Sequence, residues 1–418
     1  MVKPGYKQTE IGTLPEDWKL ATLEDLYSIT SSKRVFQSEW RDSGIPFYRA
    51  REIAVMGEGL PAPKDLYISE EMYERYSKQY GSIKENDVLI TGVGTLGKVY
   101  VVKKDDKFYF KDGNIIWLQW NGQYSSQFLK HLYRTTALTD QVFGNAGGST
   151  VPTYTITNAK ATLVPCPDYL EQCEIAEVLS EIDNLIATSE KQISKKKAIK
   201  QGAMQELLTG KKRLPGFSGE ITYQPLRSLC TVFSDGDWIE SKDQSSDGIR
   251  LIQTGNVGNG RYIDKQEKQR FISVDTFNRL NCLEIFEGDV LVSRLPDPAG
   301  RACILPPSNK CRITAVDCTV VRFSSYNPVL FVAYSQTKLY QEKVEMAMAG
   351  STRQRISRKE LGEIPIPVFP TIEEQNTVAS IFANMDAEIE ALEQKLAKYR
   401  QVKQGMMQQL LTGKIRLV

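Results

Sequence analysis

The chain has 418 residues, too many for one ordinary core, and its length predicts two to four domains. With 41% hydrophobic and 25% charged residues it has the composition of a soluble globular protein, and no apolar run predicts a transmembrane helix. The formal net charge of +2 excludes a global electrostatic attraction to nucleic acid. Any such charge must therefore be local or come from a partner.

The first residues have no apolar signal core, and seven single cysteines without a Cys-x-x-Cys pair are typical of reduced thiols. We therefore expect a cytoplasmic protein. The only histidine, His131, argues against a zinc site and against histidine-based catalysis. We expect it to be a helix-surface or packing residue.

Residues 20–165 predict a mixed α/β part. Strand-like runs are NDVLITG, KVYVVKK and NIIWLQW, and short helices are expected at SEEMYERYSKQY and SSQFLKHLYRTT. The turn TGVGTLGK matches a dinucleotide fingerprint in form only, because a strand and not a helix follows it. We interpret it as a turn between strands, with DNA contact as the functional alternative.

Three segments of this part are candidates for DNA contact. Arginine offers paired donors to guanine edges, and small hydroxylated residues allow close approach to phosphates. The segments are the early strand GIPFYRAREI, the turn at 91–98 and the loop GNAGGSTVPTYTITNAK. The candidate residues are Arg49, Arg51, Thr95, Lys98, Ser149, Thr150 and Tyr154.

A long helix of about 35 residues follows, with an apolar stripe of heptad spacing. The stripe is interrupted by Ser189, Lys196 and Lys200, and the helix ends at Gly210, which suits a left-handed C′ position. We interpret the nearby lysine run at 195–200 as a solvated face rather than a DNA surface.

Residues 224–368 predict a second mixed α/β part, with strands at GDVLVSRL, RACILPP and CTVVRFSS and a helix at VLFVAYSQTKLYQEKVE. Its candidate loops correspond to those of the first part. An exchange of arginine for Gln or Asn at a base-reading position would move the preferred base from guanine towards adenine. The candidate residues are Gln253, Asn256, Arg294, Arg301, Thr352, Arg353 and Arg355.

The chain contains a tandem duplication. A second long helix repeats the first without a gap at an offset of 203 residues, so that Asp183 matches Asp386 and Gly202 matches Gly405. Because a narrow apolar stripe of this length cannot stay exposed, we expect the two helices to form an antiparallel coiled coil. Packing of each helix on its own globular part is the alternative. The matched glycines predict a close helix approach or a partner-docking notch.

The fold class predicted is α+β: two globular α/β parts joined by two long helices, with an internal pseudo-two-fold repeat. This layout, the EQ or EEQ after a proline-rich strand, the helix end LLTGKxRL, the start IGTLPEDWKLATLEDL and LPGFSGE opening the second half resemble type I restriction–modification specificity subunits. The resemblance covers essentially the whole chain. One departure is that GEITYQPL lacks a counterpart of Trp18.

The resemblance implies a non-catalytic subunit that reads a bipartite double-stranded DNA target. It implies target recognition domains at 1–167 and 214–370, and conserved helical regions at 168–213 and 371–418. The helical regions would fix the gap between half-sites and bind two methyltransferase subunits, and the complex would recruit restriction subunits. No cofactor is expected on this chain, because S-adenosylmethionine for adenine N6 methylation would be bound by the partner. The partner-binding candidates are Gly202, Leu207, Leu208, Gly405, Leu410 and Leu411.

Three alternatives stay open. An enzyme would need a methyltransferase or nuclease motif, and Pro296-Asp297-Pro298-Ala299 is only a faint match. A specificity subunit of a related fused restriction–methyltransferase system and a non-DNA coiled-coil adaptor are the other two. Sequence-specific DNA binding in the presence of a neighbouring methyltransferase separates the adaptor from the others.

Overall fold

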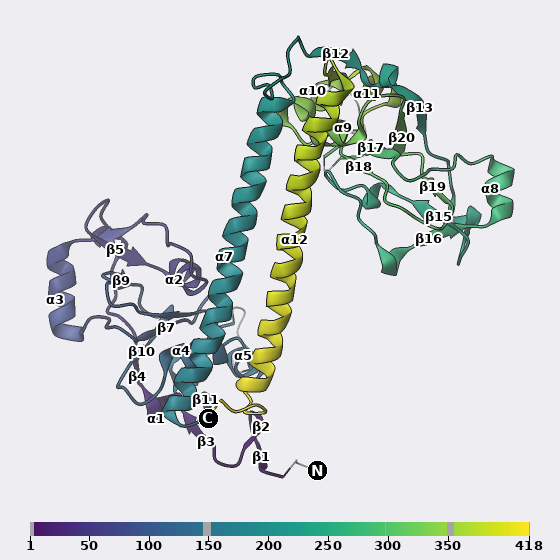
Figure 1. The fold of residues 1–418 in the computed structure, drawn as a ribbon. Coiled ribbons are helices and arrows are strands. Elements are labelled where there is room, and N and C mark those ends of the chain that lie inside the picture. Colours follow the sequence, from purple (N-terminus) through teal and green to yellow (C-terminus); the bar gives the residue numbers. More distant parts are fainter. Residues whose placement is uncertain (1–3, 145–151, 297, 349–354, 418) are drawn as a thin grey trace. The chain divides into compact units, whose positions relative to one another are not determined.

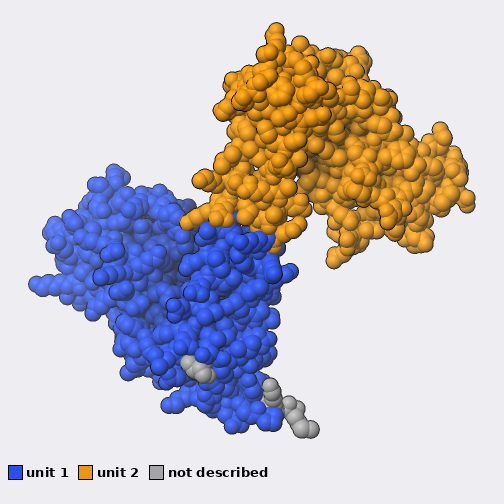
Figure 2. Space-filling view, in the orientation of Figure 1, with its two compact units in different colours: residues 1–189, 395–418 blue, residues 190–394 orange. Residues whose placement is uncertain are grey.

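A computed structural model describes residues 4–144, 152–296, 298–348 and 355–417. The chain divides into two compact units (Figure 2), unit 1 with residues 1–189 and 395–418 and unit 2 with residues 190–394. The two longest helices, α7 (Tyr169–Leu207) and α12 (Ile372–Leu410), each contribute to both units. No helix in the described ranges is long and apolar enough to cross a membrane.

Unit 1 is built around the antiparallel sheet β4-β10-β7-β8, beside which lies the smaller sheet β6-β5-β9 (Figure 1). Its elements before α7 are β1 (Tyr6–Thr9), β2 (Gly12–Pro15), β3 (Lys19–Thr22), α1 (Leu23–Leu26), β4 (Ser28–Thr30), η1 (Gln37–Glu39), β5 (Ile45–Tyr48), α2 (Ala50–Gly57), β6 (Tyr67–Ile68), α3 (Glu70–Tyr80), β7 (Val88–Thr91), β8 (Val99–Val101), β9 (Tyr109–Phe110), β10 (Ile115–Gln119), α4 (Ser126–Leu132), α5 (Thr136–Gly144), α6 (Ile156–Lys160) and β11 (Leu163–Cys166).

Unit 2 repeats this plan with the antiparallel sheet β13-β20-β17-β18 and the smaller sheet β14-β16-β15-β19. Its elements between α7 and α12 are β12 (Thr222–Pro225), η2 (Leu226–Leu229), β13 (Cys230–Asp235), η3 (Ser241–Asp243), β14 (Gln244–Ser245), β15 (Ile249–Ile252), η4 (Thr254–Asn256), η5 (Gln266–Lys268), β16 (Arg270–Ile272), α8 (Val274–Leu280), β17 (Val290–Ser293), β18 (Ala302–Ile304), β19 (Arg312–Thr314), β20 (Cys318–Phe323), α9 (Pro328–Ser335), α10 (Lys338–Met348), α11 (Arg358–Glu363) and β21 (Pro365–Val368).

The predicted strands at NDVLITG, KVYVVKK and NIIWLQW are confirmed as β7, β8 and β10. They are buried because apolar side chains line both faces of the main sheet. Their counterparts in unit 2 are confirmed as β17, β18 and β20. One difference is that the helix expected over 329–345 divides into α9 and α10. The hydroxyl of Thr337 accepts from the amide of Tyr340, which starts the second helix.

The prediction of an antiparallel coiled coil is confirmed within each unit. In unit 1 the core contains Ile175 and Leu179 from early α7 together with Leu410 from the end of α12. In unit 2 it contains Leu207 from late α7 together with Val378 and Phe382 from early α12. Each apolar stripe is therefore buried against the other helix and against a globular part at once.

Two polar breaks in the stripes, at matching positions of the two helices, are explained by ion pairs that follow the duplication. Lys200 is 7% exposed and its Nζ lies 2.5 Å from Asp386 Oδ1, while the matching Lys403 pairs with Asp183. In each unit a lysine of one long helix thus pairs with an aspartate of the other long helix. Such pairs penalise other registers, because a shift would leave a buried cation without a partner.

A second duplicated contact, between a buried glutamate and an arginine that follows the other long helix, explains the acidic residue of the EQ and EEQ motifs. Glu171, fully buried, accepts from the Arg416 guanidinium at 2.5 and 2.8 Å, and Glu374 accepts from Arg213 at 2.8 and 2.6 Å. In unit 1 the indole of Trp18, which has no counterpart in the second half, also donates to Glu171 at 3.2 Å. In unit 2 the arginine donates instead to backbone carbonyls at 218 and 219.

Candidate nucleic-acid interface

Three adjoining hollows in unit 1 form a basic surface. Their volumes are about 700, 660 and 460 Å³; the first shares Lys98 with the second and Lys111 with the third. The carboxylates that line them are Glu58 and Asp112. The cations that line them are Arg34, Arg49, Arg51, Lys98, Lys111, Lys130 and Arg134. This surface can attract a polyanion although the whole chain is nearly neutral.

Arg49 and Arg51, predicted from sequence, lie together in the first hollow because α2 begins between them. Glu52, only 2% exposed, accepts from both side chains at 3.0 to 3.1 Å and from the Arg49 amide at 2.9 Å. Burial opposes the charge of Glu52, but the contacts with Arg49 outweigh it and lower the pKa of this carboxyl. Glu52 therefore holds two arginines in fixed orientations at the surface, a role that the sequence analysis missed.

The turn between β7 and β8 places Thr95 and Lys98 in the same hollow. Gly94 and Gly97 adopt positive φ values of 80° and 69°, which allow the chain to reverse within this segment. The interpretation as a turn between strands is thus confirmed. Lys98 donates to Glu58 at 2.7 Å, and this contact lowers the pKa of the Glu58 carboxyl. A phosphate arriving at Lys98 would compete with a single exposed carboxylate.

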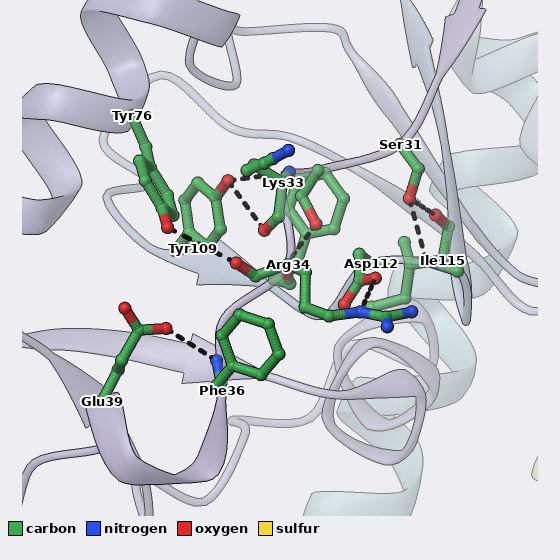
Figure 3. A network of polar contacts seen from close by, with 12 residues as sticks. Ser31, Lys33, Arg34, Phe36, Glu39, Tyr76, Tyr109, Asp112 and Ile115 are labelled. Carbon is green, nitrogen blue, oxygen red and sulfur yellow. Dashed lines mark hydrogen bonds and ion pairs between the residues drawn. The ribbon is translucent and has the colours of Figure 1, made fainter.

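A polar network fixes the third hollow (Figure 3). The Tyr109 hydroxyl accepts from the Lys33 amide at 2.9 Å, and Asp112 accepts from Arg34 Nε at 2.9 Å. The Arg34 side chain is nevertheless 66% exposed, and Phe36 beside it is 61% exposed on a backbone capped by Glu39. The adjacent basic residues Lys33 and Arg34 are the local sequence signal of this hollow, and they are not among the residues predicted from sequence.

Unit 2 uses the same framework with other side chains. The amide of Gln253 donates to Asn256 Oδ1 at 3.0 Å, as the amide of Arg49 does to Glu52, so the two pairs correspond. Both ends of the Asn256 side chain are engaged within its own loop, since Oδ1 accepts from the Gln253 amide and Nδ2 donates to the Ile263 carbonyl at 2.8 Å, so the structure gives Asn256 a bracing role and its DNA contact stays a prediction. Gln253 is partly buried and remains the counterpart of Arg49.

The predicted arginines of unit 2 have mostly structural contacts. Arg294 is 2% exposed, pairs with Asp235 at 3.2 Å and donates to the Val316 carbonyl, so its predicted DNA contact is corrected to a core role. Arg301 donates to the carbonyls of Val257, Thr254, Leu295, Pro296 and Pro298, which ties one loop to another and corrects it to a bracing role.

Arg355 has a different environment. It pairs with Asp317 at 2.7 Å and its side chain is 38% exposed, so it remains a surface candidate. Tyr154 is also corrected to the core, since it is 2% exposed and its hydroxyl lies 3.0 Å from Tyr133 and 2.6 Å from Thr162. Four other candidates lie outside the described residues, namely Ser149, Thr150, Thr352 and Arg353.

The partner-binding candidates divide into two groups. The leucines are 7% exposed or less and belong to the unit cores, which corrects them to packing residues: Leu207, Leu208, Leu410 and Leu411. Gly202 and Gly405 are exposed, and a Cβ at either would meet nothing within 4 Å. The predicted close helix approach is therefore wrong at both glycines, and the docking notch stays a prediction.

His131 is confirmed as a packing residue. It is 1% exposed on α4, and its Nε2 lies 3.2 Å from the Ser180 hydroxyl on α7. Burial lowers the pKa of this imidazole to about 3. The side chain is thus held neutral between the globular part and the long helix.

Comparisons with known proteins agree with the duplication. A family model described as the type I restriction modification DNA specificity domain matches residues 15–198 and again residues 220–399. A putative type I restriction enzyme specificity subunit, MjaX, from Methanocaldococcus jannaschii is 24% identical, and the match covers 99% of this chain and 97% of the relative. The MjaVIII specificity subunit of the same organism is 23% identical over 99% and 96% of the two chains.

Solved structures show the same fold. The S subunit of a type I restriction-modification system from M. genitalium has a TM-score of 0.63 at 14% identity, covering 94% of this chain and 96% of that one. A chain from a structure that concerns complex assembly and conformational transition of the type I R-M system has a TM-score of 0.53 at 17% identity, covering 96% and 99%.

Proposed function

Since the chain belongs to the family of type I restriction modification DNA specificity domains, with both halves matching, we propose that each unit reads one part of a two-part DNA target. The observation that carries this proposal is a shared framework with exchanged polar residues. Position 49 is an arginine in unit 1, and the equivalent position 253 is a glutamine on the same backbone cap. A duplicated reader that recognises two different sequences needs this combination.

Within unit 1 the basic surface divides into two kinds of contact. Arg49 and Arg51 are anchored by a buried carboxylate, and a fixed guanidinium can donate two parallel hydrogen bonds to a guanine edge. Lys98, Lys111 and Lys130 are point charges that suit phosphates. We assign base reading to the arginines and positioning on the duplex to the lysines.

The helices would set the distance between the two half-sites. Helix α7 has 39 residues, as has α12, and each is about 58 Å long at 1.5 Å per residue. The ion pairs of Lys200 and Lys403 support one register and hence one length. Two methyltransferase subunits would dock on the duplicated helical surface near Gly202 and Gly405, where solvent-exposed glycine has no packing role within the chain.

Those partners would bring S-adenosylmethionine and methylate adenine at N6, and restriction subunits would join the resulting complex. On this account the chain itself binds no cofactor and has no catalytic step. The DNA affinity of the complete assembly would come partly from the partners, which accounts for the small net charge of +2.

The test is a map of methylated adenines in cells that carry this chain with its methyltransferase. Replacing residues 20–165 with those of another family member should change one half of the methylated sequence and leave the other half and the gap intact. A chimera that keeps the original target would contradict the assignment of reading to the globular parts. Loss of all methylation is resolved by the reciprocal exchange of residues 224–368, which must change the other half.

A further inference from the structure

Two buried arginines lie side by side in the smaller sheet of unit 2. Strands β15 and β19 are parallel neighbours, and Arg250 is in register with Arg312. Side chains alternate along a strand, so both arginines point away from the apolar cluster formed by Ile249, Leu251 and Ile313. The register therefore puts two guanidinium groups on the same face of one small sheet.

These arginines have few partners. Arg250 is 7% exposed; it pairs with Asp264 at 3.9 Å, donates weakly to the Arg270 carbonyl at 3.5 Å, and lies over the Phe271 ring at 5.6 Å from the ring centroid. Arg312 is 5% exposed, its Nε is buried without a hydrogen-bond partner, and no residue in the described ranges forms an ion pair with it. By contrast, Arg294 of the same unit has both an acid and a carbonyl.

The fold itself does not require these cations. Leu251 and Ile313 pair in unit 2 as Phe47 and Tyr109 pair in unit 1, which sets an offset of 204 residues between the two small sheets. The positions equivalent to Arg250 and Arg312 are thus Pro46 and Phe108, and Phe108 is 3% exposed in an apolar cluster. An uncharged pair fills the same place in the sister unit.

Removing two like charges from water without a counter-charge is strongly unfavourable, and the side-by-side arrangement adds repulsion. A single half-exposed aspartate at 3.9 Å cannot compensate both. We propose that Arg250 and Arg312 form an anion site that takes a phosphate group. A guanidinium group can donate paired hydrogen bonds to phosphate oxygens, and two positive charges match a phosphate better than a carboxylate.

The phosphate can come from the DNA backbone at the second half-site, which rests on the proposed function, or from a free phosphate in solution. The first experiment measures the melting temperature of the full chain in inorganic phosphate and in chloride at equal ionic strength. The wild type should melt higher in phosphate by about 2–4 °C. Arg312→Met keeps the stem but not the charge and should lose this rise.

The direction in which Arg312→Met changes the melting temperature in chloride separates a binding role of the arginine from a structural one. Because Arg312→Met removes an uncompensated buried charge, it should melt at or above the wild type when phosphate is absent. Lys310→Met is the matched control, since it removes one charge from an exposed position two residues away. An Arg312→Met chain that melts lower in chloride, or that keeps the phosphate rise, would overturn the proposal.

A second experiment identifies the source. The complex with its methyltransferase is titrated with cognate DNA over a range of salt concentrations. If the phosphate is that of DNA, Arg312→Met should reduce the slope of log affinity against log salt by about 0.9. An unchanged slope with the thermal response retained assigns the site to free phosphate. A wild-type complex without sequence-specific binding refutes the proposed function, while the thermal measurement still decides the anion site.

Discussion

Replacing Asp183 with asparagine should destabilise unit 1 through the seam between the long helices. Asp183 pairs with Arg134 at 2.7 Å and with Lys403, and the three side chains are 29%, 29% and 18% exposed. Breaking a fully buried pair costs about 3–5 kcal/mol and an exposed pair about 0.2–1 kcal/mol. Two partly exposed pairs therefore predict a loss of about 2 kcal/mol, or about 4–8 °C in melting temperature for a unit of this size.

The assay is thermal unfolding followed by tryptophan fluorescence in a Trp238→Phe background, which leaves the other four of the five tryptophans, all in unit 1. Glu181→Gln is the matched control, since it removes the same charge from an exposed position two residues earlier on α7. Equal destabilisation by both substitutions would refute the reasoning about the seam.

The pH dependence gives an independent check on Asp183. Burial opposes its charge, but Lys403 and Arg134 outweigh burial and lower the pKa of the carboxyl. A carboxyl with a lowered folded-state pKa contributes stability above its unfolded value, about 3.9, and loses it as the pH falls through the folded value. The difference between wild type and Asp183→Asn should therefore be full at neutral pH and shrink in acid.

Three further predictions concern other parts of the chain. Burial lowers the pKa of His131 to about 3, so the unfolded chain takes up a proton first and stability falls as the pH drops below about 6.5; His131→Asn should flatten the melting temperature over that interval. Gly202→Ala and Gly405→Ala should each raise helix stability by about 1 kcal/mol in urea unfolding, whereas leucine at either position should weaken methyltransferase binding in sedimentation experiments. Arg49→Gln should reduce cognate DNA affinity by about 1–3 kcal/mol and alter one half-site only, as measured by competition binding.

The long helices could be predicted from sequence because their signal repeats. Heptad spacing and the gap-free offset of 203 residues indicate two helices that pack together. Each helix has 39 residues rather than the predicted 35. Each begins before its apolar stripe, at Tyr169 in α7 and at Ile372 in α12, and both of these residues are exposed. Heptad spacing fixes the buried centre of such a helix better than its solvated ends.

The candidate site was predicted only in part. Arg49, Arg51, Thr95 and Lys98 share one hollow because the start of α2 and the turn between β7 and β8 meet there. Arginines with the same local signal in unit 2 have another role, since Arg294 and Arg301 meet acids and carbonyls contributed by distant segments. Whether an arginine faces solvent or the backbone depends on the tertiary fold, and a single sequence carries little information on it.

For the leucines of the LLTGK motif, the sequence suggested a surface role, whereas the structure places them in the cores. The resemblance directs attention to LLTGK as a shared motif, and shared motifs suggest partner surfaces. Leu208 and Leu411 instead fill the cores at the ends of the helices, at 0% and 3% exposure. The motif recurs because the last turn of each long helix packs its leucines into the core of one unit.

The most direct test of the central claim is a paired deletion of one heptad from each helix, residues 186–192 and residues 389–395, followed by mapping of methylated adenines. The two deletions lie inside the cross pairs of Asp183 with Lys403 and of Lys200 with Asp386, so the register contacts are kept. Shortening each helix by about 10 Å predicts a gap between the half-sites about 3 base pairs shorter, with both half-site sequences unchanged. An active complex that keeps the original gap would contradict the claim that the helices set the distance between two DNA readers.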